Sequence, residues 1–246
     1  MNFIADVDNS STKIAVIEGN KILAREEYEH PEVSDFDALF ARFPLIDKAI
    51  VSSSGADGER VFSMVEGRVG YLLRMTPSTP VPLRNEYSTP ETLGTDRLAA
   101  AVGAKMLYGA DNMLIVDFGT AITYDLVVDG AFVGGNISLG LYGRLRALHE
   151  YTSSLPHCLP TDEKLLCGNS TRTAVEQGVM SGIEYETEGY IEKLSKKYVN
   201  LCIIFTGGDS KYFVKRIKNT IFANRDLTLF GLHGILEYNA NKEKDI

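Results

Sequence analysis

The sequence predicts an α/β protein built from two similar lobes. One observation is an internal repeat; the other is the alternation of short apolar runs, typical of strands, with longer periodic segments, typical of helices. Strands that alternate with helices predict mixed sheets covered by helices. We place the N-terminal lobe at residues 1–110 and the C-terminal lobe at residues 111–246.

The repeat appears when the chain is shifted by 111 positions, the distance from Asp6 to Asp117. The shift aligns identical residues without a gap, among them Asp6 with Asp117, Thr12 with Thr123, and Gly19 with Gly130. Each copy has the pattern of a strand ending in Asp, a polar turn, a second apolar strand, and a glycine-containing hairpin into a third strand. The shared order of elements favours a duplication.

The elements after each hairpin complete the two lobes. In the first, Ser34 and Asp37 have the spacing of a capping box, which predicts a helix that ends near Phe43. The other predicted elements of this lobe are a strand at Ala49–Ser52, a helix at Gly58–Gly67, a strand at Tyr71–Met75 and an Ala-rich helix at Thr95–Tyr108. Those of the second lobe are helices at Gly140–Tyr151 and Thr171–Lys196, a strand at Leu201–Phe205, a helix at Ser210–Asn219 and a helix after Gly231.

Composition and charge exclude several classes of function. The chain of 246 residues has a net charge of −8, which argues against nucleic acid as a partner because phosphate backbones bind clustered Lys and Arg. Its three cysteines lack metal-ligand spacing and suit reduced thiols in the cytosol. There is no signal-peptide pattern and no apolar run of the roughly 18 residues that a membrane span needs. We therefore expect a cytoplasmic protein without a membrane partner.

The repeated hairpin suggests phosphate chemistry. A polar turn offers backbone N–H groups and hydroxyls to phosphate oxygens, and the Asp at the strand end can hold a divalent cation directly or through water. Two such lobes suit a nucleotide held in a cleft between them. The candidates are Asp6, Asn9, Ser10, Ser11, Thr12 and Lys13 in the first turn, Asp117, Gly119, Thr120 and Thr123 in the second, and the later turn Thr206-Gly207-Gly208. The sequence contains no P-loop motif.

The first turn also allows a different interpretation. A strand that ends in Asp-x-Asp resembles the nucleophile loop of haloacid-dehalogenase phosphatases, in which Asp6 would attack phosphorus and Asp8 would act as the general acid. Those enzymes need a later Gly-Asp followed by another acid. Gly208-Asp209 is followed only by Ser-Lys-Tyr-Phe. That fold also leaves the repeat unexplained.

Six segments, taken in order, resemble type III pantothenate kinases along nearly the whole chain. Their family patterns are Asp-x-Gly-Asn-Thr, Asn-x-Tyr…Pro…Gly-x-Asp-Arg, Asp-x-Gly-Thr-Ala-x-Thr, Gly-Gly-x-Ile…Leu-x-x-Leu, a glycine-led helix start, and a late glycine turn. The matching segments are Asp6–Ser10, Asn85–Arg97, Asp117–Thr123, Gly134–Leu148, Gly168–Gly178 and Thr206–Gly208. The resemblance implies the two-lobed actin-like ATPase (ribonuclease H-like) fold.

The resemblance also implies an activity and its residues. The activity is transfer of the γ-phosphate of ATP, with Mg²⁺, to pantothenate, giving 4'-phosphopantothenate in the first step of coenzyme A synthesis. Asp96 is implied as the general base, and the pantothenate site as Tyr87, Gly94, Thr95, Asp96, Arg97 and Thr171. ATP is implied to contact Asp6, Val7, Asp8, Asn9, Ser10, Ser11, Thr12, Lys13 and Thr120, with Asp6 reaching Mg²⁺ through phosphate or water. Asp117 is implied to bind a monovalent cation, K⁺ or NH₄⁺, in a homodimer.

One residue departs from the family pattern. Asp8 stands where the family has glycine beside the triphosphate, and a carboxylate there repels phosphate unless a cation intervenes. This leaves a second class of function open, a non-catalytic relative that senses a metabolite. A kinase of the same superfamily that acts on a sugar or a small acid is a third hypothesis, which the segment from Tyr87 to Arg97 disfavours.

Overall fold

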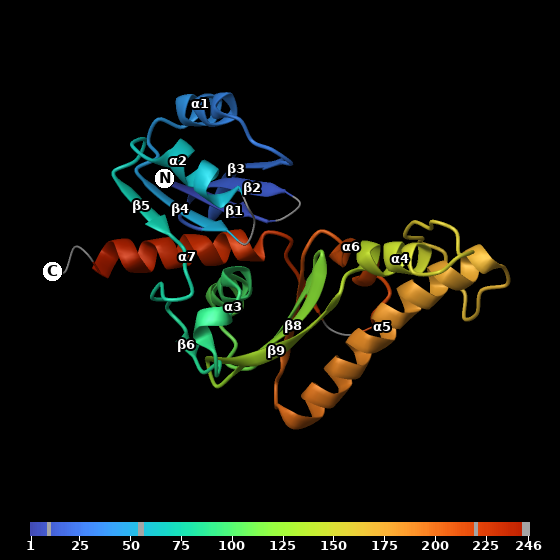
Figure 1. Ribbon diagram of the computed structural model, residues 1–246. Coiled ribbons are helices and arrows are strands. Elements are labelled where there is room, and N and C mark those ends of the chain that lie inside the picture. Colours follow the sequence, from blue (N-terminus) through green and yellow to red (C-terminus); the bar gives the residue numbers. More distant parts are fainter. Residues whose placement is uncertain (9–10, 54–56, 219–220, 243–246) are drawn as a thin grey trace. The chain divides into compact units, whose positions relative to one another are not determined.

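The computed structural model describes residues 1–8, 11–53, 57–218 and 221–242, and Figure 1 shows its elements in chain order. Contacts divide the chain into two compact units. The first comprises residues 1–109, residues 130–132 and the segment from Asp226 onward; the second comprises residues 110–129 and 133–225. No helix within the described ranges is long and apolar enough to cross a membrane.

The first unit is built on a five-stranded sheet with the order β3-β2-β1-β4-β5. Its strands are β1 (Asn2–Val7), β2 (Thr12–Glu18), β3 (Lys21–Tyr28), β4 (Lys48–Ser53) and β5 (Tyr71–Arg74). The first three form antiparallel pairs, whereas β1, β4 and β5 run parallel to one another. The carboxyl ends of the parallel strands therefore meet at one edge, where open α/β sheets bind their ligands.

Helices cover both faces of this sheet. They are α1 (Val33–Arg42), α2 (Gly58–Val65), α3 (Thr95–Tyr108) and α7 (Leu227–Lys242). One core joins β1 to α1 and α2 through Phe3, Phe36 and Val61, all fully buried. On the other face, where Figure 1 shows α7 and α3, Asn2 donates to Glu237 of α7 at 2.5 Å. Alternate residues of β1 thus face different helix layers.

The second unit contains the strands β11-β10-β7-β8-β9. These are β7 (Met113–Phe118), β8 (Ala121–Val128), β9 (Ala131–Leu139), β10 (Cys202–Thr206) and β11 (Phe222–Ala223), with helices α4 (Leu141–Glu150), α5 (Thr171–Lys197) and α6 (Ser210–Phe213). Its core packs Phe118, Phe205 and Phe213 together. The short strand β6 (Arg84–Asn85) pairs with the start of β9, and the single-turn helix η1 (Pro90–Thr92) follows it.

The two copies of the sequence repeat fold into equivalent hairpins. Strand β1 spans residues 2–7 and β7 spans residues 113–118, so the shift of 111 superimposes their bounds. Both hairpin glycines adopt the left-handed backbone conformation, with φ of 57° at Gly19 and 70° at Gly130. The pairing differs by one residue, because Asp6 lies opposite Lys13 whereas Asp117 lies opposite Thr123.

Several sequence predictions differ from the structure in detail. The capping box of α1 is formed by Glu32 and Asp35 rather than by Ser34 and Asp37. Helix α6 ends at Phe213, and the predicted end at Asn219 lies outside the described residues.

The last helix, α7, differs from its prediction in the residue at which it begins and in the compact unit to which it belongs. A Cβ at Gly231 would lie 1.8 Å from the carbonyl oxygen of Ala99, so this glycine lets α7 approach α3 rather than opening the helix. A Cβ at Gly103 of α3 would lie 2.2 Å from the carbonyl oxygen of Leu227. This close packing places α7 in the first compact unit, although the predicted lobes put residues 226–246 in the second.

Candidate functional site

Three elements of the first unit meet at the carboxyl edge of its sheet. Asp6, near the end of β1, is 3% exposed and lies opposite Ser52 of β4 in the parallel register. The Ser52 hydroxyl forms a 3.0 Å hydrogen bond with the hydroxyl of Thr95, the first residue of α3. The buried aspartate and the helix that carries Asp96 are therefore positioned by the same strand.

The turn after β1 is closed by its own backbone. The N–H of Asp8 donates to the carbonyl oxygen of Ser11 at 2.9 Å, and Lys13 donates from Nζ to Oδ2 of Asp8 at 2.7 Å. The Ser11 hydroxyl donates to Glu27 at 3.2 Å, and Thr12 is buried. The predicted residues Asn9 and Ser10 lie outside the described part of the chain.

Asp96 is held against the start of its helix. It is the second residue of α3 and half-buried, and a Cβ at Gly94 would lie 2.4 Å from its Oδ1 atom. Only glycine at position 94 leaves room for the carboxylate in this position.

The Arg97 side chain lies beside two aromatic rings. Its side chain is 7% exposed, and its guanidinium carbon lies 5.7 Å from the ring centroid of Tyr87 and 5.8 Å from that of Phe132. The two rings pack edge to face at 6.0 Å. The structure thus brings Tyr87 and Arg97 together. No sequence pattern pointed to Phe132, because its place beside them depends on the pairing of β6 with β9.

Asp117 lies in a glycine cradle in the second unit. A Cβ at Gly207, whose φ is 87°, would lie 2.3 Å from Oδ1 of Asp117, and a Cβ at Gly119 would lie 3.5 Å from the same atom. The two glycines therefore let the backbone approach this half-buried carboxylate closely. Burial raises the pKa of the neighbouring Asp209, whose N–H donates to the carbonyl oxygen of Phe118.

Thr120 and Thr171 are both exposed residues of the second unit. The carbonyl oxygen of Thr120 accepts from the N–H of Gly140 at 3.0 Å. Thr171 is the first residue of α5, and the Ser170 side chain caps that helix by accepting from the Thr173 N–H at 3.2 Å. Asp117, Thr120 and Thr171 are thus in one unit, and Asp6, Tyr87 and Asp96 are in the other.

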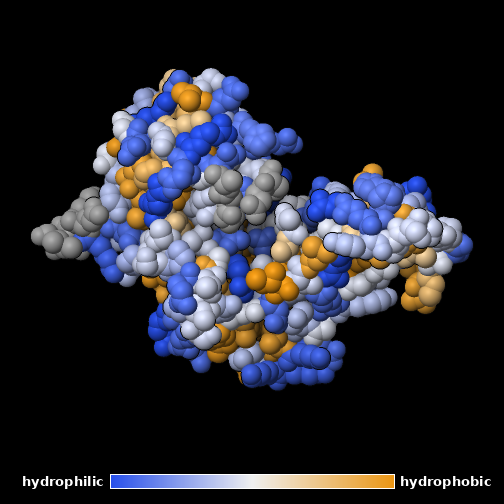
Figure 2. All heavy atoms as spheres, viewed as in Figure 1, coloured by the Kyte–Doolittle hydropathy of each residue, from blue (hydrophilic) through white to orange (hydrophobic). Residues whose placement is uncertain are grey.

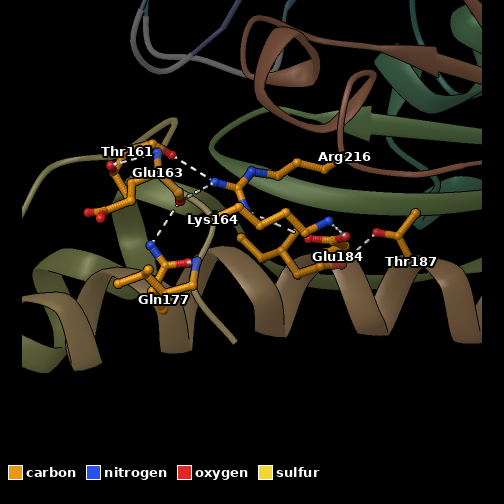
Figure 3. A network of polar contacts seen from close by, with 9 residues as sticks. Thr161, Glu163, Lys164, Gln177, Glu184, Thr187 and Arg216 are labelled. Carbon is orange, nitrogen blue, oxygen red and sulfur yellow. Dashed lines mark hydrogen bonds and ion pairs between the residues drawn. The ribbon is translucent and has the colours of Figure 1, made fainter. Parts of the chain in front are cut away.

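A buried polar network fixes the loop that precedes Thr171, as Figure 3 shows. Arg216 donates to the carbonyl oxygens of Thr161 and Glu163 at 3.0 and 2.8 Å. Gln177 of α5 donates to the same Glu163 oxygen at 2.9 Å. Three hydrogen bonds from two side chains therefore anchor this backbone segment to Arg216 and to α5.

Comparison with known proteins identifies the family. A model of type III pantothenate kinases matches residues 2–193. A type III pantothenate kinase of Phocaeicola vulgatus is 38% identical over 240 residues, covering 97% of this chain and 99% of the relative. One from Porphyromonas gingivalis is 41% identical over 244 residues, covering 97% of this chain and 98% of the relative. This chain belongs to the type III pantothenate kinase family.

Solved structures support the same fold. A Baf family protein from Campylobacter jejuni matches with a TM-score of 0.64 at 18% identity, covering 97% of this chain and 99% of that protein. The activator of 2-hydroxyisocaproyl-CoA dehydratase from Clostridium difficile, solved with bound ADPNP, matches with a TM-score of 0.55 at 11% identity. The match covers 100% of this chain and 97% of that protein. The predicted α/β fold of the actin-like ATPase and sugar-kinase type is confirmed. Neither the family nor the fold favours the haloacid-dehalogenase alternative.

Proposed function

We propose that this chain phosphorylates pantothenate with ATP in coenzyme A biosynthesis. The observation that carries the proposal is membership of the type III pantothenate kinase family over nearly the full length. The segments that resemble the family contain Asp6, Asp96 and Asp117. The geometry agrees with this activity, because a carboxylate at the start of α3 lies beside the sheet edge where nucleotide-binding folds hold their ligands.

The proposed reaction is an in-line transfer. Asp96 accepts the proton of the primary hydroxyl as its oxygen bonds to the γ-phosphorus of ATP, and the bond from that phosphorus to the β–γ bridging oxygen breaks to release ADP. Gly94 and Thr95 position Asp96, and Tyr87, Arg97 and Thr171 complete the pantothenate site. Phosphoryl transfer needs this alignment more than covalent participation by the protein.

Nucleotide and cations have separate proposed sites. The turn from Asp6 to Lys13 and Thr120 hold ATP, and Asp6 reaches Mg²⁺ through phosphate or water. Mg²⁺ neutralises the charge that develops on the transferred phosphoryl group. Asp117 in its glycine cradle is proposed to bind K⁺ or NH₄⁺. These assignments draw ATP-binding residues from both copies of the repeated hairpin.

We further propose a homodimer, formed through α5. A Cβ at Gly178, Gly182 or Gly189 would meet no atom within 4 Å, so this stripe of the helix is uncovered in the single chain. Tyr185 on the same helix is 57% exposed. Figure 2 shows apolar residues gathered at a few places on a mainly hydrophilic surface. Small residues allow two helices to approach closely. Sedimentation of the wild type and of Gly182→Arg tests this, with a shift to monomer expected for the variant.

A cytoplasmic location follows from the proposed substrates, ATP and pantothenate. It also suits three cysteines that are free in the described structure, since reducing compartments keep thiols unpaired. Fractionation of cells that express the full chain tests the location.

A coupled ADP-release assay tests the activity. The pure protein is given Mg²⁺-ATP with pantothenate, with a panel of sugars, or with no acceptor, in potassium and in sodium. We expect ADP release that depends on pantothenate. Release with a sugar alone would overturn the substrate, and silence with every acceptor, despite measurable ligand binding, would identify a non-catalytic relative.

A further inference from the structure

Helix α3, which carries Asp96, touches helix α7 backbone to backbone (Figure 1). A Cβ added at Gly231 of α7 would lie 1.8 Å from the carbonyl oxygen of Ala99 and 3.0 Å from the backbone nitrogen of Gly103. Ala99 and Gly103 have the spacing of a helical hydrogen bond, so Gly231 lies against the hydrogen-bonded backbone of α3. A larger residue at position 231 therefore has to displace one of the two helices.

The contact between the two helices is reciprocal and buried. A Cβ at Gly103 would lie 2.2 Å from the carbonyl oxygen of Leu227, the first residue of α7. Every residue of α3 from Arg97 to Ala104 is buried, a run of more than two turns, so the helix is enclosed on all sides. Because protein interiors are close-packed and transmit strain, α3 cannot absorb an overlap locally.

Helix α7 is attached to the sheet on both sides of Gly231. Before it, Asp226 accepts from Nε of Arg25 on β3 at 2.6 Å. After it, Glu237 accepts from Nζ of Lys48 on β4 at 2.7 Å. Hydrogen bonds between charged groups are the stronger ones, and these two resist a displacement of α7. An overlap at Gly231 is therefore relieved mainly by movement of α3.

The contact lies one turn away from the proposed general base. Ala99 follows Asp96 by three residues, which is about 4.5 Å along the axis of an α-helix. The start of α3 is joined to β4 by a neutral hydrogen bond, 3.0 Å between the hydroxyls of Thr95 and Ser52. Neutral bonds of this kind are weaker than those that hold α7. A displacement of α3 at Ala99 thus also moves the carboxylate of Asp96.

We propose that Gly231 is a positioning residue for the phosphoryl transfer, because it sets the distance between α3 and α7 and thereby the place of Asp96. This inference rests on the proposed function, in which Asp96 accepts the proton of the hydroxyl. Ordinary contacts between non-bonded heavy atoms are about 3.5–4.0 Å, so a Cβ at position 231 has to separate from Ala99 by more than about 1 Å. Gly231 lies outside the segments that carry the family resemblance.

Steady-state kinetics of Gly231→Ala test the proposal. With pantothenate as the acceptor we expect kcat to fall by about 10- to 100-fold, the loss that a misplacement of about 1 Å gives. KM for ATP should equal that of the wild type, because the proposed ATP residues lie on other elements. In the Asp96→Asn background the same substitution should lower kcat by less than about twofold, because the base that it displaces is already gone. A merely structural role would lower kcat equally in both backgrounds.

Gly234→Ala is the matched control, since it makes the same change on the same helix. The added Cβ would meet the side chain of Met106, with Sδ 2.0 Å away, instead of backbone atoms. The Met106 side chain is flexible and 43% exposed, so it can turn aside without moving α3. The kinetics of this variant should equal those of the wild type.

If Gly231→Ala does not fold, Gly103→Ala makes the corresponding overlap from α3 against Leu227. It should lower kcat with the same dependence on Asp96. A wild-type kcat in the folded variant, or the same loss in both backgrounds, overturns the positioning role. A wild type without turnover of pantothenate refutes the proposed function, and the role of Gly231 with it.

Discussion

The Nζ atom of Lys13 lies 2.7 Å from Oδ2 of Asp8, across the turn that follows β1. Both side chains are partly buried, with 29% and 27% of their surfaces exposed. Asp8 stands where the family pattern has glycine, so this chain carries an extra negative charge at its proposed phosphate turn and pairs it with the lysine of the same turn. The pair offsets the charge, and it also occupies a cation that could otherwise contact phosphate.

The first prediction concerns Asp8→Gly. The substitution removes a charge that repels phosphate and breaks the ion pair with Lys13, so ATP should bind more tightly. We expect KM for ATP to fall by about tenfold, which corresponds to about 1.4 kcal/mol. The measurement is a titration of ATP at fixed free Mg²⁺, and Asp8→Asn should give part of the gain.

Lys13→Met separates the two contributions to this change. If Lys13 contacts phosphate once released, Asp8→Gly should gain less in the Lys13→Met background than in the wild type. A rise of KM in Asp8→Gly would show instead that Asp8 binds Mg²⁺ beside Asp6. If neither Asp8→Gly nor Asp8→Asn changes KM for ATP, the Asp8 carboxylate lies away from the phosphates.

The second prediction concerns Asp96→Asn. The amide keeps the size of the side chain and removes the proton acceptor, so kcat should fall by roughly 10²–10⁴-fold. Binding of pantothenate, measured by calorimetry, should persist because the hydrogen bond of Thr95 with Ser52 still positions the helix. A variant with nearly wild-type turnover would reduce Asp96 to a residue that only stabilises the start of α3.

The third prediction concerns Asp117 and monovalent cations. With a cation bound in the cradle of Gly207, activity should be higher in potassium than in sodium at equal ionic strength. Asp117→Asn should lose most of this difference, because the amide oxygen carries no net charge. Equal rates of the wild type in the two salts would remove the monovalent site from the proposal.

The sequence was sufficient for elements whose limits are set locally. Helix α3 has the predicted bounds, Thr95–Tyr108, because Gly94 and Gly109 flank it and Gly109 adopts the left-handed conformation that ends helices. The repeat predicted both hairpins, because the limits of each are set within the hairpin itself by its polar turn and its glycine, Gly19 or Gly130. The extent of α7 could not be predicted, since Gly231 looks like a helix boundary until its contact with Ala99 is known.

The candidate site was predictable as a set of residues but not as an arrangement. Motifs identified Asp6 and Asp96, but the connection between them depends on the register of β1 with β4 and on Ser52. The ion pair of Asp8 with Lys13 depends on side-chain orientation, which spacing alone does not fix. The roles of these residues in binding and catalysis remain predictions.

The last prediction concerns the free energy of unfolding and the network before α5. Glu184 and Arg216 are 5% and 7% exposed, and their nearest charged atoms, Oε2 and Nη1, are 3.7 Å apart without a hydrogen bond in the described structure. Removing Arg216 takes the buried cation away from the buried Glu184 carboxylate and leaves it the exposed Lys164. Breaking a buried pair in this way costs about 3–5 kcal/mol. We therefore expect Arg216→Met to lower the free energy of unfolding in urea by about that amount.

Two further variants test whether the buried charge is the cause. Lys164 pairs with the same glutamate at 2.5 Å but is 54% exposed, so Lys164→Gln should cost only about 1 kcal/mol or less. The double variant Arg216→Met with Glu184→Gln should be more stable than the sum of its single changes predicts, because it removes the buried carboxylate together with its buried cation. Additive losses would show that Arg216 acts through its hydrogen bonds to Thr161 and Glu163 alone, and that the carboxylate of Glu184 contributes independently.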